Sequence, residues 1–260
     1  DQLQNSGLDP GTPVAVLHES SDGKWLFIRD GIASGWVKRG NIAFAGRWAW
    51  LRHLRAGDSG VVVSARAALY LDRSMARPAA VVRMGTRLRI RRVTRRSVEI
   101  FYPLRDGDGT VRFAAAFIDP RDIIRGVLPY TQRMVIVQAF KLLDAPYGWG
   151  DMNGGQDCSR FIQMVFATMG LHLPRNSGEQ GRSGQALAGL NEAVGGLTVL
   201  QLKGHVMLFL GNENGRPYAI HAAWAYRRPG PEGEVTEPLR RVVVSDLSLG
   251  EGSSRGSLLE

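Results

Sequence analysis

The sequence predicts a multidomain protein in which small all-β modules precede an α+β domain. Residues 1–45 alternate short apolar strands with turns, and residues 60–125 repeat much of that plan. From about residue 126, helical patterns replace the strands, and strands return only after residue 200. A length of 260 residues accommodates one large domain or two to three small ones, so this division is compatible with the size of the chain.

The composition is that of an ordinary globular protein, with 44% hydrophobic and 22% charged residues. No apolar run reaches the roughly 18 residues of a membrane-spanning helix, so none is expected. The single cysteine excludes internal disulfides and a multi-thiolate metal site. The five histidines show no metal-ligand spacing, so no metal site is predicted.

The net charge of +9 suits an anionic partner such as a cell wall, a membrane surface or a nucleic acid. Much of the charge is concentrated between Arg83 and Arg96. No aromatic residue is interleaved in this stretch, as a platform for single-stranded nucleic acid would require. We therefore favour a solvated strand face and loop, and no nucleic-acid partner is expected.

The N-terminal part contains two related patterns of strands. Strands over 14–17 and 25–28 flank a turn at 20–23, and a third strand follows at 35–37. Gly85-Thr86-Arg87-Leu88 echoes Gly11-Thr12-Pro13-Val14, an offset of 74 residues. This self-similarity predicts two copies of one small β module, joined by a segment over 44–59.

The C-terminal part begins with a helix that Thr131 caps and that runs to about residue 143. A turn-rich segment and a second helix follow, then a loop that begins near 174 and includes a short helix near 185–190. Strands are predicted over 205–210, 218–224 and 242–244, with a loop over 211–217. Residues 247–260 have the composition of a flexible tail.

The only cysteine lies at the start of the second helix. Asp157 is the expected N-cap, which places Cys158 in the first turn. The partial positive charge of a helix N-terminus lowers a thiol pKa, whereas the Asp157 carboxylate opposes that effect. A cationic histidine would then decide the ionisation state. The alternative interpretation is a small buried cysteine without chemistry.

Two histidines lie on the first two strands of the C-terminal part. In a hairpin with a loop of five to seven residues, the residue numbers of two opposed positions add up to 426 or 428. In either register His205 and His221 point to the same face. A nucleophilic cysteine needs a base, and the base needs an orienting group, so this pair suits nucleophilic catalysis. A structural histidine pair is the alternative.

Five motifs give the region 126–245 a specific resemblance. In order they are P-Y-G-W-G at 146–150, D-C-S at 157–159, P-R-N-S at 174–177, H-V-M-L-F-L-G at 205–211 and A-I-H-A at 219–222. Together they resemble the NlpC/P60 family of cell-wall cysteine peptidases. The two N-terminal modules resemble bacterial SH3 (SH3b) domains. The implied architecture is two small all-β SH3b-like barrels, over 1–45 and 60–125, followed by a papain-like α+β domain over 126–245.

The resemblance implies roles for individual residues. Cys158 corresponds to the nucleophile, His205 to the base and His221 to the third polar residue. Tyr147 lies beside the nucleophile in the family and would bind substrate or the oxyanion. No metal or organic cofactor is needed for this chemistry.

The two N-terminal modules suggest a subfamily, the γ-D-glutamyl-L-diamino acid endopeptidases. These cut stem peptides of peptidoglycan that carry a free N-terminal L-Ala, and the residues that correspond to their amine site are Asp157, Ser159 and Ser177. The chain departs from the family in two places near the nucleophile. Asp151 and Arg160 each stand where a glycine is usual. Asn176 replaces an aspartate that is common in the P-R-x-S motif.

Two other functions stay open. One is a different papain-like amidase, such as a muramoyl-alanine amidase, and the other is a wall-binding SH3b protein with an inactive catalytic domain. We expect a monomer that acts on peptidoglycan stem peptides or muropeptides. The expected location is the cell envelope, the periplasm or the medium, with cytoplasmic recycling as the alternative.

Overall fold

The computed structural model describes residues 3–55 and 58–259, without the side chains of 52–55. By its internal contacts the chain divides into two compact units. One unit comprises 8–128, and the other combines 129–260 with the N-terminal residues 1–7. The finer boundaries expected at 45, 60, 126 and 245 stay predictions.

The first unit begins with a three-stranded antiparallel sheet of β1 (Ala15–Glu19), β2 (Trp25–Arg29) and β3 (Ser34–Lys38). Leu26 and Ile28 are buried on one face of β2, which is the alternation that a half-buried strand requires. The three strands coincide with the predicted ones to within two residues. A 3₁₀ turn (Arg39–Asn41) and helix α1 (Arg47–Arg55) follow.

A seven-stranded sheet completes this unit, in the order β10-β4-β7-β8-β9-β5-β6. Its apolar residues form one core that includes Leu69, Ile100 and Ile118. The strands confirm an all-β segment here, while a second SH3b barrel stays a prediction. Their bounds are β4 (Ser59–Val62), β5 (Arg66–Tyr70), β6 (Pro78–Arg83), β7 (Arg87–Val93), β8 (Val98–Arg105), β9 (Val111–Ile118) and β10 (Ile123–Arg125).

The basic stretch of this unit is mostly a solvated strand face. Arg89 and Arg91 of β7 lie over the ring of Phe101 in β8, with guanidinium carbons 4.5 and 5.8 Å from its centre. Arg83 is the exception, because it is buried and forms an ion pair with Asp9 (Nε to Oδ1, 2.9 Å).

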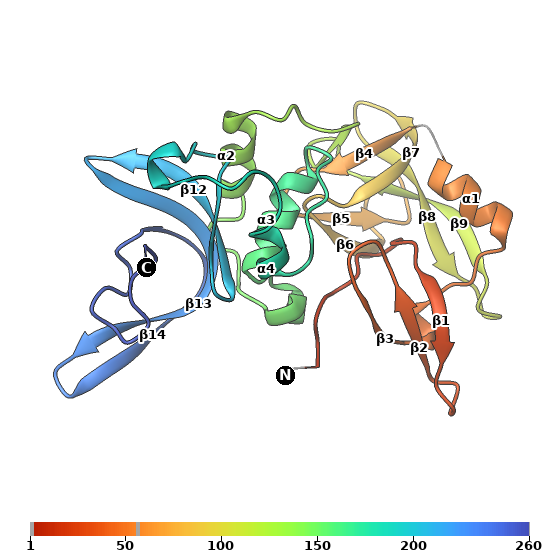
Figure 1. Cartoon of the computed structure of the whole chain (residues 1–260). Coiled ribbons are helices and arrows are strands. Elements are labelled where there is room, and N and C mark those ends of the chain that lie inside the picture. Colours follow the sequence, from red (N-terminus) through yellow and green to blue (C-terminus); the bar gives the residue numbers. More distant parts are fainter. Residues whose placement is uncertain (1–2, 56–57, 260) are drawn as a thin grey trace. The chain divides into compact units, whose positions relative to one another are not determined.

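The second unit is an antiparallel sheet with helices packed on it. The sheet order is β11-β12-β13-β14, and helix α3 packs on β12 and β13 (Figure 1). Both predicted caps are confirmed, because the Thr131 side chain accepts from Met134 N and the Asp157 side chain from Arg160 N. The elements are α2 (Gln132–Phe140), a 3₁₀ segment (Trp149–Gly154), α3 (Cys158–Ala167), α4 (Ser177–Gln180), a 3₁₀ turn (Leu190–Glu192), β11 (Val199–Leu202), β12 (His205–Glu213), β13 (Arg216–Gly230) and β14 (Gly233–Asp246).

Three local predictions differ from this structure. The loop expected over 211–217 is only a turn at Asn214 and Gly215, since β12 and β13 continue further. The helix expected near 185–190 is replaced by the 3₁₀ turn over Leu190–Glu192. The tail is folded, because Leu247, 1% exposed, packs with Met207 and Ala219. Burial of such apolar groups stabilises the segment against detachment.

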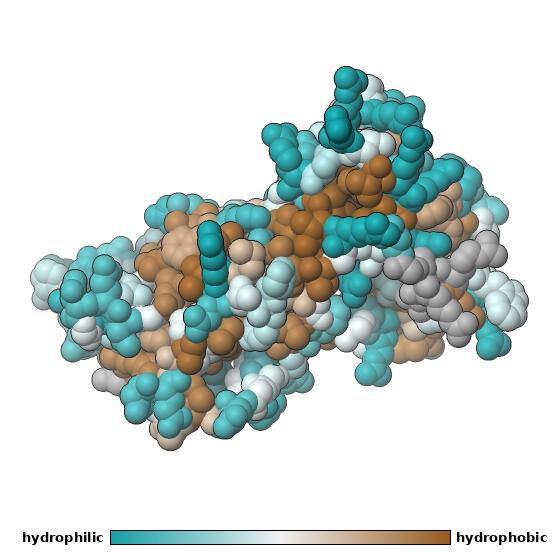
Figure 2. Space-filling model, turned by 90° about the horizontal axis from the view of Figure 1, so that it is seen from above, coloured by the Kyte–Doolittle hydropathy of each residue, from teal (hydrophilic) through white to brown (hydrophobic). Residues whose placement is uncertain are grey.

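Within the described ranges, 3–55 and 58–259, no helix is long and apolar enough to cross a membrane. On the face drawn in Figure 2, hydrophilic side chains are spread between apolar patches. Large apolar side chains that stay exposed include Trp36 in the first unit and Trp224 in the second.

Candidate active site

The segment before α3 approaches itself closely, and this approach positions the nucleophile candidate. Gly148 N donates to Gln156 O (3.2 Å), and Gln156 N donates to Pro146 O (3.2 Å). A Cβ on Gly155 would lie 2.6 Å from Gly148 N, so only glycine fits there. This pairing places Tyr147 alongside the residues that lead into Cys158, the first residue of α3.

Tyr147 lies near Cys158 and Asp157. Burial raises the pKa of its hydroxyl far above the usual value, and the charges of Cys158 and Asp157 add to the shift. The hydroxyl is therefore protonated at any physiological pH, and it is a hydrogen-bond donor near the nucleophile.

The two histidines lie against each other as the sequence predicts. Leu208 pairs with Ile220, so opposed residues add up to 428, one of the two expected registers. His205 Nε2 lies 2.8 Å from His221 Nδ1. His221 Nε2 lies 3.0 Å from the hydroxyl of Ser245 in β14, a residue that the sequence analysis did not consider.

When His205 is a base, these contacts allow one set of N–H positions on the two rings. If His205 Nδ1 accepts the thiol proton, His205 Nε2 carries a hydrogen and donates it to His221 Nδ1. His221 Nε2 then carries its own hydrogen and donates it to Ser245 Oγ. The chain His205–His221–Ser245 is therefore compatible with the tautomer that a general base needs, since the Ser245 hydroxyl can accept this hydrogen.

Cys158 lies against the start of β12. Burial raises the pKa of its thiol, and a backbone hydrogen bond from Val206 opposes that shift. Burial lowers the pKa of His205 to about 4 and, together with repulsion from His205, that of His221 to about 3. Both effects favour the neutral thiol–imidazole pair in the resting site. A neutral imidazole at His205 has the protonation state that a general base needs.

Asp157 is fully engaged within the protein. Its carboxylate accepts from Gly150 N (3.2 Å), Arg160 N (2.9 Å) and the Ser159 hydroxyl (3.0 Å). Arg175 adds a bidentate contact, 3.0 and 2.6 Å long. A carboxylate has about four lone-pair sites, so no acceptor capacity is left for a substrate ammonium. Burial raises its pKa, but the hydrogen bond and charge of Arg175 outweigh burial and lower the pKa overall.

Of the two predicted serines, Ser159 contacts this carboxylate directly. Ser159 is buried, and its hydroxyl accepts from Arg175 (2.9 Å). Ser177 is half-buried at the start of α4. Gln180 links the two places, because its amide donates to Ser159 O (2.9 Å) and Pro174 O (2.8 Å). The structure thus brings the D-C-S and P-R-N-S motifs together.

The two departures from the family pattern pair with each other. Asp151, a buried residue with φ of 67°, has a carboxylate 3.4 Å from the Arg160 guanidinium. Arg175 lies 3.8 Å from the same carboxylate. Sequence analysis noted each residue alone but not this pairing. Two aspartates and two arginines, including Asp157, therefore form one buried network with no net charge beside the nucleophile.

The N-terminal residues of this unit bind to the same network. Gly7 N–H donates to Asp151 Oδ2 (2.9 Å), and Arg175 Nε donates to the Ser6 hydroxyl (3.1 Å). The Gln4 side chain donates to Gly150 O (2.8 Å). In the part of the chain that the structure describes, no group of three or more His, Cys, Asp or Glu residues is arranged to hold a metal ion.

The buried histidines predict a pH-dependent stability. Their folded-state pKa values lie below the ordinary value of about 6.5, so the unfolded chain binds more protons between pH 6.5 and about 4. The stability is fully present above pH 6.5 and is lost as pH falls through this window. Each histidine contributes up to about 1.4 kcal/mol per pH unit to the free energy of unfolding.

Hydrogen exchange of the amides of α3 and β12, corrected for its intrinsic pH dependence, measures this slope. His205→Gln should reduce it, whereas His172→Gln, which changes an exposed histidine of the same unit, should leave it unchanged. An equal slope in wild type and His205→Gln would contradict the prediction.

Cys158 opens a helix that packs on the two strands carrying the histidine pair, an arrangement that suits cysteine–histidine nucleophilic catalysis. Comparison with known families makes this more specific. Residues 144–224 match the NlpC/P60 family, and residues 1–38 match an SH3 domain of the SH3b1 type. Residues 144–224 are therefore similar to NlpC/P60 domains, and residues 1–38, which precede them, are similar to SH3b domains.

Individual relatives agree with this assignment. Gamma-D-glutamyl-L-lysine dipeptidyl-peptidase of Bacillus subtilis (strain 168) is 33% identical over 85 residues, which are 32% of this chain and 25% of that protein. An NlpC/P60 endopeptidase from Photobacterium damselae subsp. piscicida superposes with a TM-score of 0.77 and 19% identity, over 100% of this chain and 63% of that one. An NlpC/P60 family protein from Bacillus cereus ATCC 10987 superposes with a TM-score of 0.66 and 18% identity, over 94% of this chain and 77% of that one.

These similarities define the fold rather than the substrate. Both structural likenesses lie under 20% identity. The chain spans about a quarter of the curated relative and less than two thirds of the Photobacterium protein.

Proposed function

We propose that this chain is a cysteine endopeptidase that hydrolyses the bond between the γ-carboxyl of D-glutamate and the diamino acid in peptidoglycan stem peptides. The observation that carries the proposal is the packing of α3, which begins at Cys158, on the strands that hold His205 and His221, whose ring nitrogens are 2.8 Å apart. The Bacillus relative, described as a γ-D-glutamyl-L-lysine peptidase, supports the choice of bond.

The proposed mechanism has two steps. Cys158 Sγ attacks the γ-carbonyl carbon while His205 takes the thiol proton. His205 then gives that proton to the leaving nitrogen of the diamino acid, and the acyl-enzyme forms. In the second step His205 removes a proton from water, which attacks the thioester, and the thiol is restored. The Cys158 backbone N–H, the helix N-terminus and the Tyr147 hydroxyl stabilise the oxyanion.

The residues around Asp157 limit how an N-terminal L-Ala is recognised. The carboxylate that the sequence analysis gave to the amine already accepts from several donors, Arg175 among them. We retain a free L-Ala end in the proposal, with the hydroxyls of Tyr147 and Ser177 as acceptors. Because the Asp157 carboxylate is already engaged by Arg175, N-acetylation is expected to lower kcat/KM by less than about tenfold.

The net charge of +9 suits the anionic bacterial cell wall, so the proposed place of action is the cell envelope or the medium. Wall stem peptides or released muropeptides are the proposed partners.

Mass spectrometry of digests tests the proposal. L-Ala-γ-D-Glu-diamino acid peptides should yield L-Ala-D-Glu and the diamino acid fragment, with one water added. Release of an intact stem peptide from a muramyl-linked substrate would instead indicate an amidase. Binding to isolated wall without any cleavage would favour the non-catalytic alternative.

A further inference from the structure

Trp224 is an exposed aromatic residue beside the candidate active site. It lies in β13 at a bulge between Ala223 and Ala225, and its side chain is 56% exposed. Its ring centre is 5.8 Å from that of Tyr147, with the planes tilted by 58°. Since Tyr147 adjoins Cys158, Trp224 extends the surface next to the nucleophile by one ring.

Arg240 covers the Trp224 ring. Its guanidinium carbon lies 4.9 Å from the ring centre, within the range of a cation–π contact. The same residue is part of the bulge in β14, where its φ is 52°. A left-handed conformation is costly for a side chain of this size, and such bulges re-aim side chains next to active sites.

The backbone of Arg240 is joined to the active-site segment. Its carbonyl accepts from Tyr147 N (2.8 Å). Two residues on, Val242 O accepts from Asp144 N (3.0 Å) and Val242 N donates to Ala145 O (2.9 Å). Tyr147, Trp224 and Arg240 therefore form one stacked group that is fixed to the residues preceding the nucleophile.

The charge of Arg240 has no counterpart in the described part of the chain. Its guanidinium is exposed and forms no ion pair with any carboxylate described. Neighbouring arginines differ, since Arg241 lies 3.4 Å from Asp144 and Arg228 lies 2.6 Å from Glu237. An arginine that rests over an aromatic ring is already partly ordered, so it loses less entropy when its planar donors bind a carboxylate.

We propose that Trp224 and Arg240 form a subsite for a carboxylate of the substrate next to the scissile bond, an inference that rests on the proposed function. Two carboxylates have this position in a stem peptide. One is the α-carboxylate of D-glutamate on the acyl side, and the other belongs to the diamino acid on the leaving side. Trp224 supplies an apolar floor for the adjoining methylenes, and Arg240 supplies the charged donors.

Peptides that differ only in which carboxylate is amidated distinguish the D-glutamate carboxylate from that of the diamino acid. Wild-type protein is assayed on the free peptide, on the peptide amidated at D-glutamate and on the peptide amidated at the diamino acid. One amidation should lower kcat/KM by about tenfold, as expected for one charged hydrogen bond at an exposed site. The position of that amide identifies the bound carboxylate.

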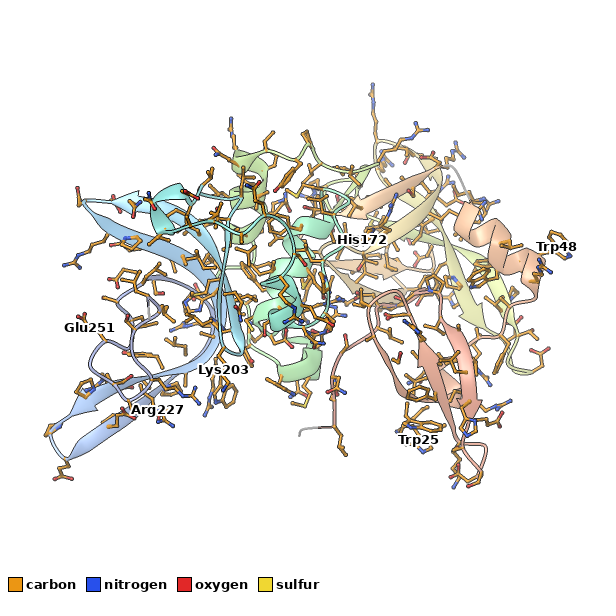
Figure 3. The ribbon with its side chains drawn as sticks, in the orientation of Figure 1. Trp25, Trp48, His172, Lys203, Arg227 and Glu251 are labelled. Atoms are coloured by element: carbon orange, nitrogen blue, oxygen red, sulfur yellow. The ribbon has the colours of Figure 1, made fainter. Side chains whose placement is uncertain are left out.

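Arg240→Gln should remove this preference, because it lowers the rate on the free peptide about tenfold and leaves the amidated peptide within twofold. Arg241→Gln is the matched control, with the same charge change one residue away, and should keep the preference. Lys203→Gln tests whether removal of any positive charge near the site lowers the rate on the free peptide. Lys203 lies in the turn that leads into His205 (Figure 3).

Three results would overturn the inference while the proposed function stands. The first is an equal rate of the wild type on all three peptides. The others are an equal loss of rate on free and amidated peptides in Arg240→Gln, or a loss of preference in Lys203→Gln as large as that in Arg240→Gln. Binding of the same peptides to Cys158→Ala, followed by calorimetry, gives a readout without turnover. If the wild type cleaves none of the peptides but Cys158→Ala binds the free one about tenfold more tightly, the subsite stands and the proposed function fails. Absence of both cleavage and selective binding would overturn both.

Discussion

Cys158→Ser is expected to lower kcat for stem-peptide hydrolysis by about four to six orders of magnitude, the usual cost of losing a nucleophile. The serine hydroxyl fits the site, but at neutral pH it is a far weaker nucleophile than a thiol whose proton His205 accepts. The measurement is product release followed by mass spectrometry under single-turnover conditions. Activity within tenfold of wild type would end the cysteine-peptidase proposal.

The residues behind Cys158 should give a graded series. His205→Ala removes the base and should cost nearly as much as the loss of the thiol, because the two groups act as a unit. His221→Ala should cost less, about ten- to a hundredfold, since an orienting group is partly replaceable. Ser245→Ala should cost less again, because its hydroxyl contacts His221 (3.0 Å) and so acts on His205 at one remove.

Exposed His172 supplies the control for this series, since His172→Ala should leave kcat unchanged. Circular dichroism and hydrogen exchange of α3 separate lost chemistry from lost folding. If His221→Ala were more damaging than His205→Ala, the roles of the two histidines would have to be exchanged.

Local chemistry made much of this site predictable. Thr131 and Asp157 cap their helices as their residue types predict, since each side chain accepts a backbone N–H three residues later. The two-residue period of a strand was enough to place His205 and His221 on one face, because either hairpin register gives the same parity.

Residues that act through distant partners could not be predicted in this way. Ser245 contacts His221 across a strand pair whose length and register depend on the whole sheet. Arg175 reaches Asp157 over 18 residues of loop and helix. The composition of 247–260 is polar and small, yet Leu247 and Leu258 pack with Met207 and Ala219 of the sheet. A local pattern carries no signal for such long-range contacts.

Asp151 and Arg160 show how a departure from a family pattern can be explained by structure. Each stands where the family usually has a glycine. In the structure the second replacement supplies the counter-charge for the first, with 3.4 Å between Arg160 Nε and Asp151 Oδ2. Neither residue alone predicts this, because the partner lies in the next element.

Asp151→Gly is expected to lower the free energy of unfolding of the second unit by about 3–5 kcal/mol, because it leaves two buried arginines with the single carboxylate of Asp157. The Gly7 N–H also loses its acceptor. Relief of the left-handed backbone at residue 151 offsets only about 1 kcal/mol of this loss. Hydrogen exchange of α3 measures the change.

The double variant Asp151→Gly, Arg160→Gly tests whether the two residues compensate each other. Since both charges leave together, its loss should be smaller than the sum of the single losses by at least about 2 kcal/mol. Glu237→Gln is the control, because the Arg228–Glu237 pair is exposed and its loss should cost under about 1 kcal/mol. Additive losses would show that Asp151 and Arg160 act independently, with Arg175 alone balancing the charge of Asp151.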